Sequence, residues 1–273
     1  ELILVDNNSS DKSTFKEVRP YWHTNQSLIE EKKQGLTNAR LAGFENALGD
    51  CIVLVDDDNV LNQDYLERAL SIFQEHPDQG AWGGKIHLAF EKEPPEYIHQ
   101  FEALLAGRNF GDGVKTGNWS KSKEYPFFSP VGAGMVSRRN AIQKYCRQAR
   151  QNHPTLLDRA GDSLMSAGDN DIVMHALESG FDVGYFPELE LTHLIPEERT
   201  TPDYLRKINF STSCSWVIVT HQHGICPWKP IRKFTIPPRQ ARAWFRMKAW
   251  RGLKENIHWH GACGIFEGRS MIR

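Results

Sequence analysis

The order of apolar segments in the first 55 residues constrains the fold of this chain more than any other feature. Residues Leu2–Val5 and Cys51–Val55 have the composition of short buried strands, and Thr37–Leu48 between them has the pattern of a helix. A strand, a helix and a second strand in this order are typical of a right-handed βαβ unit. The sequence therefore predicts an α/β fold with a mainly parallel sheet flanked by helices.

The alternation of strands and helices continues to about residue 200, where the pattern changes. Four further segments are expected to form helices or strands: Gln63–Glu75, Trp82–Ala89, Asn140–Gln151 and Ala167–Ser179. Beyond Pro202 the sequence becomes helical, basic and aromatic. We expect one α/β domain over residues 1–200 and a helical extension over residues 201–273.

Composition excludes several classes of protein. Of the 273 residues, 40% are hydrophobic and 25% are charged, which excludes disordered and coiled-coil chains. No apolar stretch approaches the roughly 18 to 20 residues of a membrane-spanning helix. The five cysteines show no CxxC spacing, and their odd number favours free thiols in a reducing compartment. These observations predict a cytoplasmic location.

Acidic residues follow both of the first predicted strands. Asp6 comes directly after Leu2–Val5, and the run Asp56–Asp58 comes directly after Cys51–Val55. We expect these strands to be neighbours, so that their carboxylates meet at one edge of the sheet. Like charges at such an edge need a cation, and a hard divalent ion with oxygen ligands fits them. The alternative is an acidic turn that caps the next helix.

A basic segment lies near the C-terminus. Residues 228–254 contain nine Lys or Arg and no Asp or Glu, whereas the remaining 24 basic and 34 acidic residues have a net charge of −10. Within this segment, Arg239–Arg251 interleaves basic with aromatic residues. An anionic membrane surface is a partner that such a helix fits. Nucleic acid is not expected, because the chain has no recognised nucleic-acid-binding module. The alternative is a helix that packs its aromatic residues on the α/β domain.

Two segments share the pattern HxHGxC. They are His221–Cys226 and His258–Cys263. Four histidines and two cysteines could supply zinc ligands, but this spacing matches no standard structural zinc module.

Four blocks of sequence carry a resemblance to a known family. They are Leu2–Asp11, Gly35–Arg40 followed by Ala47–Asp58, Val131–Arg138, and Ala167–Ile172 followed by Tyr185–Pro196. In this order the blocks resemble the inverting nucleotide-sugar transferases of glycosyltransferase family 2, which have the GT-A fold. The family begins with a further strand and helix, so the resemblance implies that residues 1–200 are an N-terminally truncated catalytic domain.

The resemblance implies a nucleotide-sugar site. Asp6 would lie near the base, Arg40 would contact the nucleotide, and Asp56 would lie towards the ribose with Asp57 beside it. Val131–Val136 reads as a strand whose residues Gly132 and Gly134 line the donor sugar. Taken without the resemblance, Arg40 could instead be a solvated or ion-paired surface residue, and the two glycines could serve tight packing alone.

The resemblance also implies a metal and a catalytic base. Asp58 would bind Mg²⁺ or Mn²⁺ at the donor diphosphate, and His193 is a candidate further ligand. Asp169 would be the general base, although Gly168 replaces the glutamate that the family usually has there, so Asp171 is the alternative base. Without the resemblance, His193 could be a hydrogen-bonded core residue and Asp169 a helix N-cap.

The function implied is an inverting, hexosyltransferase-like enzyme. It would move a sugar from a nucleotide-diphospho-sugar, with a UDP-sugar expected, to a hydroxyl of a glycan or lipid-linked acceptor in surface polysaccharide or glycan biosynthesis. Attachment to the inner face of the cell membrane would run through residues 228–254. The alternatives are a nucleotidyltransferase, or an inactive truncated domain that only binds a metal or a membrane.

Overall fold

The computed structural model describes residues 1–10, 23–120, 123–152 and 167–273. The strands are β1 Leu2–Asp6, β2 Gln26–Glu30, β3 Cys51–Val53, β4 Asn59–Leu61, β5 Gln79–Phe90, β6 Lys115–Gly117, β7 Val136–Arg138 and β8 Asp182–Ile195. The α-helices are α2 Leu36–Asn46, α3 Tyr65–Glu75, α4 Arg139–Asn152, α5 Gly168–Glu178, α6 Pro202–Gln222, α7 Ile236–Met247 and α8 Leu253–Met271. Short 3₁₀ turns are η1 Glu96–Gln100, η2 Glu102–Leu105, η3 Glu197–Thr200 and η4 Lys233–Thr235.

The main sheet is mixed, with the strand order β3-β7-β5-β8-β4 and with β6 also paired to β8. Its longest pairing, between β5 and β8, is parallel, whereas the pairings that β3, β4, β6 and β7 make are antiparallel. The α/β class is confirmed, but the sheet is not mainly parallel. The difference arises because the short strands β4, β6 and β7 fill positions that the alternation of longer segments does not reveal.

The first strand does not pair with the strand that precedes the aspartate run. β1 pairs in parallel with β2 in a separate two-stranded sheet, and β3 pairs with β7. The expectation that Leu2–Val5 and Cys51–Val55 are neighbouring strands is therefore wrong. The sequence analysis did not predict β2, because Gln26–Glu30 is short and about half polar. This strand, and not β3, is the hydrogen-bonded partner of β1.

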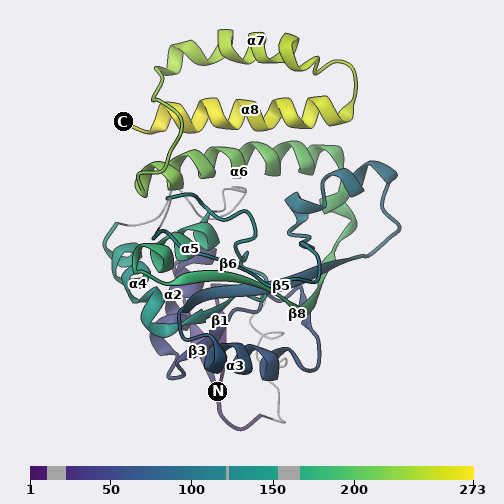
Figure 1. Ribbon diagram of the computed structural model, residues 1–273. Helices are drawn as coiled ribbons and strands as arrows, with labels where there is room; N and C mark the ends of the chain where they lie inside the picture. The colour runs from purple at the N-terminus through teal and green to yellow at the C-terminus, as the bar shows by residue number, and fades with distance from the viewer. Residues whose placement is uncertain (11–22, 121–122, 153–166) are drawn as a thin grey trace.

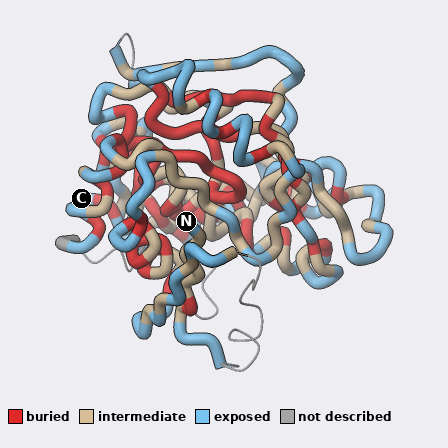
Figure 2. Tube along the Cα trace, turned by 90° about the horizontal axis from the view of Figure 1, so that it is seen from below, coloured by how far each residue is buried: buried red, intermediate tan, exposed pale blue. Residues whose placement is uncertain are grey.

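Successive residues of β5 point into different parts of the core. Ala81 belongs to a cluster with residues of α2, α4 and α5, whereas Trp82 belongs to a cluster with Tyr65, Ala69 and Ile72 of α3. This alternation is the two-residue period of a strand, so helices cover both faces of the sheet. Figure 1 shows α3 on one side of the sheet and the remaining helices on the other, and Figure 2 shows the buried residues gathered in the interior of the molecule.

The C-terminal residues form a stack of helices in the order α6, α8 and α7, with α7 outermost (Figure 1). Three glycines of α8 lie at i, i+3 and i+7, on one face of the helix: Gly261, Gly264 and Gly268. A Cβ atom at Gly264 would stand 2.1 Å from the carbonyl oxygen of Phe210 in α6. The two backbones therefore approach closely because this face has no side chains. The helical C-terminal extension is confirmed, and the domain boundary near residue 200 stays a prediction.

The part of the chain that the structure describes contains no helix long and apolar enough to cross a bilayer. All five cysteines are free.

Candidate functional site

The turn between β3 and β4 places Asp58 against the last part of β8. The carbonyl oxygen of Asp58 accepts a hydrogen bond from the backbone of Leu194 at 2.8 Å, and Asn59 pairs with His193 in the antiparallel ladder. As a result, Asp58 Oδ2 lies 3.2 Å from Nε2 of His193. The two residues predicted to bind a metal come together although 135 positions separate them in the sequence.

The hydrogen bond made by Nδ1 of His193, the outer ring nitrogen, determines whether Nε2, the inner one, has a lone pair to offer a metal. Nδ1 lies 2.9 Å from the carbonyl oxygen of Leu105, which can only accept, so Nδ1 carries a hydrogen. In the neutral ring, the lone pair of Nε2 then faces the carboxylate of Asp58. A backbone carbonyl on the outer nitrogen is the usual support of a metal-binding histidine. His193 is thus both a buried, hydrogen-bonded residue and a suitable ligand, and a divalent cation shared with Asp58 fits this donor set.

Arg199 is a third member of this group, and the sequence analysis missed it. Its Nη1 donates to Asp58 Oδ2 at 2.9 Å from η3, just beyond β8. Burial alone would raise the pKa of Asp58, but the hydrogen bonds and charges of His193 and Arg199 outweigh it and hold that pKa below its usual range. Asp58 is therefore a carboxylate held ready for a cation. No local sequence signal marks Arg199, because its partner lies 141 positions away.

A second group forms around Arg40 in α2. The guanidinium lies 4.0 Å from Asp56, and the side chain is only 8% exposed, so the alternative of a surface residue is wrong. A Cβ atom on Gly132 would stand 2.0 Å from Nη2 of Arg40, so the glycine is what lets the guanidinium lie against this backbone. Nε of Arg40 is buried and has no hydrogen-bond partner among the described residues. A buried, unsatisfied donor next to Asp56 suits an anionic or polar ligand.

The carboxylate of Asp169 also contacts Gly132, the residue against which Arg40 lies. Its Oδ2 accepts from the backbone nitrogen of Gly132 at 3.2 Å, and its Oδ1 accepts from that of Asn170 at 2.9 Å. The N-cap of α5 is Ala167, so the alternative that Asp169 caps the helix is wrong. Two backbone groups from different segments thus fix the carboxylate at the start of α5.

Arg108 and Tyr125 are near enough to Asp169 for its charge to act on both, and the sequence analysis singled out neither. Burial lowers the pKa of Arg108, and the charge of Asp169 opposes this effect. Burial raises the pKa of Tyr125, and the charge of Asp169 raises it further. The hydroxyl of Tyr125 also accepts from Asn170 at 2.8 Å, which ties it to the same turn of helix.

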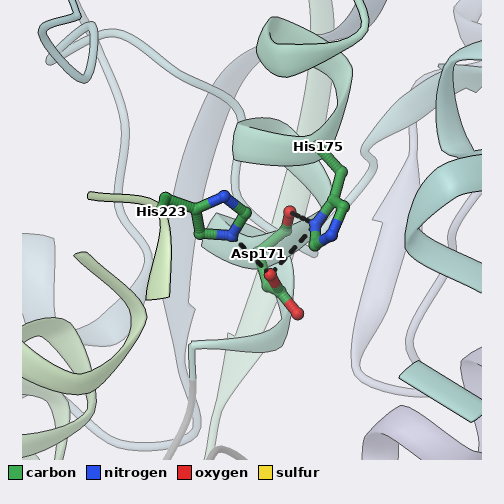
Figure 3. A group of neighbouring side chains, drawn as sticks. All are labelled: Asp171, His175 and His223. Carbon is green, nitrogen blue, oxygen red and sulfur yellow. Dashed lines mark hydrogen bonds and ion pairs between the residues drawn. The ribbon is translucent and has the colours of Figure 1, made fainter. Parts of the chain in front are cut away.

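Asp171, the alternative base, faces a different part of the molecule. Its Oδ1 lies 3.0 Å from Nδ1 of His175 and 2.8 Å from Nε2 of His223 (Figure 3). Two residues along a helix correspond to a rotation of about 200°, so Asp169 and Asp171 cannot serve one site. The carboxylate beside Gly132 and Arg108 is that of Asp169.

The remaining predicted residues have different surroundings. Asp6 is buried at the end of β1, where its Oδ1 accepts from the backbone of Ser9 at 2.8 Å. Asp57 is exposed, and no side-chain contact is recorded for it among the described residues. Gly134 has φ of +70°, and its carbonyl accepts from the Tyr65 hydroxyl at 2.5 Å. This conformation ends any strand, so the predicted strand Val131–Val136 is instead a turn followed by β7.

An open groove of about 790 Å³ has Arg108 in its wall, and the charge of Asp169 acts on this arginine. The other walls come from β5, the η1 and η2 turns and the loop residues Asn109, Phe110 and Phe127. Phe127 is 72% exposed, which is unusual for an aromatic ring of this size.

The two HxHGxC segments do not form a joint site. Among the described residues, one group of three or more His, Cys, Asp or Glu side chains is close enough to hold a metal, and it comprises Asp171, His175 and His223. Of the six His and Cys residues in the repeated pattern, only His223 takes part.

Comparisons with known proteins find similar sequences and a similar fold. The family model described as Glycosyl transferase family 2 matches residues 1–145. Glucosyl-dolichyl phosphate glucuronosyltransferase of Haloferax volcanii is 22% identical over 211 residues, which are 75% of this chain and 62% of that protein. Polypeptide N-acetylgalactosaminyltransferase 11 of Xenopus tropicalis is 33% identical over 82 residues, or 28% of this chain and 14% of that protein. The chain thus spans less than two thirds of the length of either relative.

A solved structure, that of GalNAc-T7 with UDP, GalNAc and Mn²⁺, shares the fold. The match covers 99% of this chain and 50% of that chain, with a TM-score of 0.52 and 12% identity. It supports the GT-A fold that the sequence predicts.

Two glycines of the turn before β7 should respond differently to alanine. Gly134→Ala should lower the free energy of unfolding by about 2–3 kcal/mol, because φ is positive and the new Cβ would stand 2.2 Å from Leu191. Gly132→Ala should cost about 1 kcal/mol or less, because its Cβ meets only the end of the Arg40 side chain, which can move. Urea unfolding of both variants measures the difference. Equal losses would contradict the assignment of Gly132 to the Arg40 contact.

Proposed function

The chain belongs to glycosyl transferase family 2, and we propose that it transfers a sugar from a nucleotide-diphospho-sugar to an acceptor hydroxyl with inversion of configuration. We further propose a UDP-sugar as the donor and a glycan or lipid-linked acceptor of surface polysaccharide or glycan assembly. The observation that supports this most is the position of the Asp169 carboxylate, which two backbone N–H groups hold beside Gly132, the residue against which the Arg40 guanidinium also lies.

In this proposal Asp169 is the general base. It takes the proton of the acceptor hydroxyl as that oxygen forms a bond to the anomeric carbon, and the bond from this carbon to the diphosphate breaks on the opposite side. The leaving group is the nucleoside diphosphate, which takes the bonding electron pair. Single displacement needs no covalent intermediate, so one base is sufficient. Asp171, which is hydrogen-bonded to two histidines, is then free of any part in proton transfer.

The donor nucleotide would bind around Arg40 and the aspartates. We propose that the buried Nε of Arg40, which lacks a partner among the described residues, serves the nucleotide together with Asp56. Asp6 and Asp57 are proposed to lie towards the base and the donor, with Gly132 leaving room for the donor sugar. Gly134, in the same turn as Gly132, is proposed to line the donor sugar too, and its close contacts with Tyr65 and Leu191 give it a packing role as well.

Asp58 and His193 would hold the divalent ion, Mg²⁺ or Mn²⁺. One carboxylate and one imidazole suit Mn²⁺ at least as well as Mg²⁺. When bound, such an ion neutralises the negative charge that develops on the leaving diphosphate. Arg199, which now donates to Asp58, would have to give up this contact or share it. Its positive charge stays within reach of the diphosphate in either case.

The groove next to Arg108 is proposed to take the acceptor. Its wall contains Arg108, on which the charge of Asp169 acts, and the exposed ring of Phe127 in its lining offers an apolar face of the kind on which a sugar ring or a lipid can pack. The archaeal relative is named for a dolichyl phosphate-linked sugar, which supports a lipid-linked acceptor for this chain.

The outer face of α7 is proposed to meet an anionic membrane. All nine basic residues of the segment 228–254 are exposed, and no ion pair is recorded for them among the described residues. Exposed aromatic rings of Phe234, Phe245 and Trp250 lie among them. Trp244 instead contacts Trp259 of α8 with ring centroids 4.8 Å apart, so one face of α7 packs inward and the other faces solvent. We propose a cytoplasmic enzyme at the inner face of the membrane.

Replacement of the proposed base tests the function directly. Asp169→Asn keeps the size of the side chain and one of the two backbone hydrogen bonds, because an amide has a single accepting oxygen, but it cannot take a proton, so turnover should fall by about two to four orders of magnitude. Asp171→Asn should cost much less. Release of nucleoside diphosphate measures turnover, and circular dichroism checks folding. Near-normal turnover of Asp169→Asn together with an inactive Asp171→Asn would reverse the assignment, and two active variants would refute it.

Removal of the metal should abolish activity. Excess chelator should stop turnover and added Mn²⁺ should restore it, whereas Asp58→Ala should not respond to any divalent ion. His193→Ala should retain more activity than Asp58→Ala, because a carboxylate is the stronger ligand for a hard cation. Asp64→Ala, which removes an exposed carboxylate paired with Arg68, is the matched control. Full activity in excess chelator contradicts the proposal.

Binding to vesicles tests the membrane surface. Vesicles with anionic lipid should retain the chain at low salt and release it as salt rises. The double variant Arg242→Gln and Arg246→Gln should bind more weakly by about 1 kcal/mol per lost charge. The control is the double variant Lys123→Gln and Arg147→Gln, which removes two exposed charges elsewhere. Cosedimentation measures both, and equal binding to neutral vesicles would show that the charges play no part.

A further inference from the structure

A cluster of titratable side chains outside the proposed active site joins α5 to the end of α6. Asp171 and His175 lie at i and i+4 on one face of α5, and His223 follows the last residue of α6. Figure 3 shows both imidazole rings directed at the Asp171 carboxylate. The side chains are 14%, 5% and 4% exposed, respectively, and one ligand atom from each lies within 4.8 Å of the others.

His223 has a carboxylate oxygen against each ring nitrogen. Nδ1 lies 2.8 Å from Oε1 of Glu178, and Nε2 lies 2.8 Å from Oδ1 of Asp171. A neutral imidazole has one N–H and one lone pair, so it can donate to only one of them. The other contact sets a lone pair against a negative oxygen unless a second proton or a cation is present.

His175 has the same difficulty. Its Nε2 lies 2.6 Å from the amide oxygen of Gln148, and its Nδ1 lies 2.8 Å from the backbone carbonyl oxygen of Asp171 and 3.0 Å from Oδ1 of the same residue, so each of these neighbours is an acceptor. If both rings were protonated, two positive charges would be buried with ring centroids only 4.7 Å apart. A single cation between the inner nitrogens and the carboxylate would remove both conflicts, and it would also lie near the carbonyl oxygen of Asp171.

We propose that Asp171, His175 and His223 bind one Zn²⁺ ion. Two imidazoles and one carboxylate are a common protein ligand set of zinc, and they are softer than the oxygen-rich sites that Mg²⁺ prefers. Glu178 and Gln148 then accept hydrogen bonds from the outer nitrogens of His223 and His175, which fixes the rings with their inner lone pairs towards the metal.

The proposed ion has a structural role. It would link the end of α6 to the first two turns of α5, the helix whose first turn also carries Asp169. The C-terminal helices would thus be anchored to the helix that presents the proposed base. The ion takes no part in the transfer step, so this inference does not depend on the proposed function.

Zinc titration of the full chain tests the site without any sugar donor. Metal-free protein is titrated with Zn²⁺ against a chromophoric chelator. The wild-type chain should bind one equivalent with a Kd below about 1 µM, and His223→Ala should bind at least about 100-fold more weakly. His221→Ala, which removes a histidine two residues earlier, and His193→Ala, at the other candidate metal site, should keep the wild-type affinity.

X-ray absorption of the zinc-loaded wild-type chain provides a test that needs no variant. It should show two imidazole nitrogens at about 2.0–2.1 Å from the metal. Absence of stoichiometric Zn²⁺, an unchanged affinity in His223→Ala, or a spectrum without two imidazoles would each overturn the proposal. In that case a proton on each ring nitrogen of His223 would satisfy its two carboxylate contacts, and a Gln148 amide with its oxygen and nitrogen exchanged would donate to Nε2 of His175.

Discussion

The concentration of carboxylates around one end of the sheet is the constraint on which the arrangement of the site depends. Three aspartates there have an arginine nearby, and the three arginines come from different parts of the chain: Arg40 of α2 beside Asp56, Arg108 beside Asp169, and Arg199 beyond β8 beside Asp58. Like charges gathered in a partly buried region are stable only with such partners. The same positive groups are then available to a diphosphate, so the charges that stabilise the fold also suit it to an anionic donor.

Much of the site was predictable because its signals are local. Three short sequence patterns marked it: the strand followed by Asp56–Asp58, the turn at Gly132 and the start of α5. Other features depend on contacts between distant segments, which one sequence does not encode locally. Arg199 reaches Asp58 across 141 positions and His223 reaches Asp171 across 52. The mixed sheet was missed for the same reason, since three-residue strands such as β7 are defined by their partners and not by their own composition.

The C-terminal helices connect two surfaces with different proposed partners. Small residues of α8 let it pack closely on α6, and α7 lies outside them with exposed basic and aromatic side chains. The inner end of α6 carries His223 to α5, next to the turn that holds Asp169. The helix proposed to meet a membrane and the helix proposed to be catalytic are therefore joined through one compact stack. This arrangement suits an enzyme whose acceptor is held in or near a lipid surface.

The products released from a panel of nucleotide sugars show whether this chain transfers a sugar. The chain is incubated with Mn²⁺, each donor and a lipid-linked or glycan acceptor, and nucleoside diphosphate and pyrophosphate are measured separately. We predict release of nucleoside diphosphate from a UDP-sugar, dependent on Mn²⁺, with no pyrophosphate. Pyrophosphate release would instead indicate nucleotidyl transfer, and the absence of nucleoside diphosphate with every donor would contradict a glycosyltransferase activity of this chain.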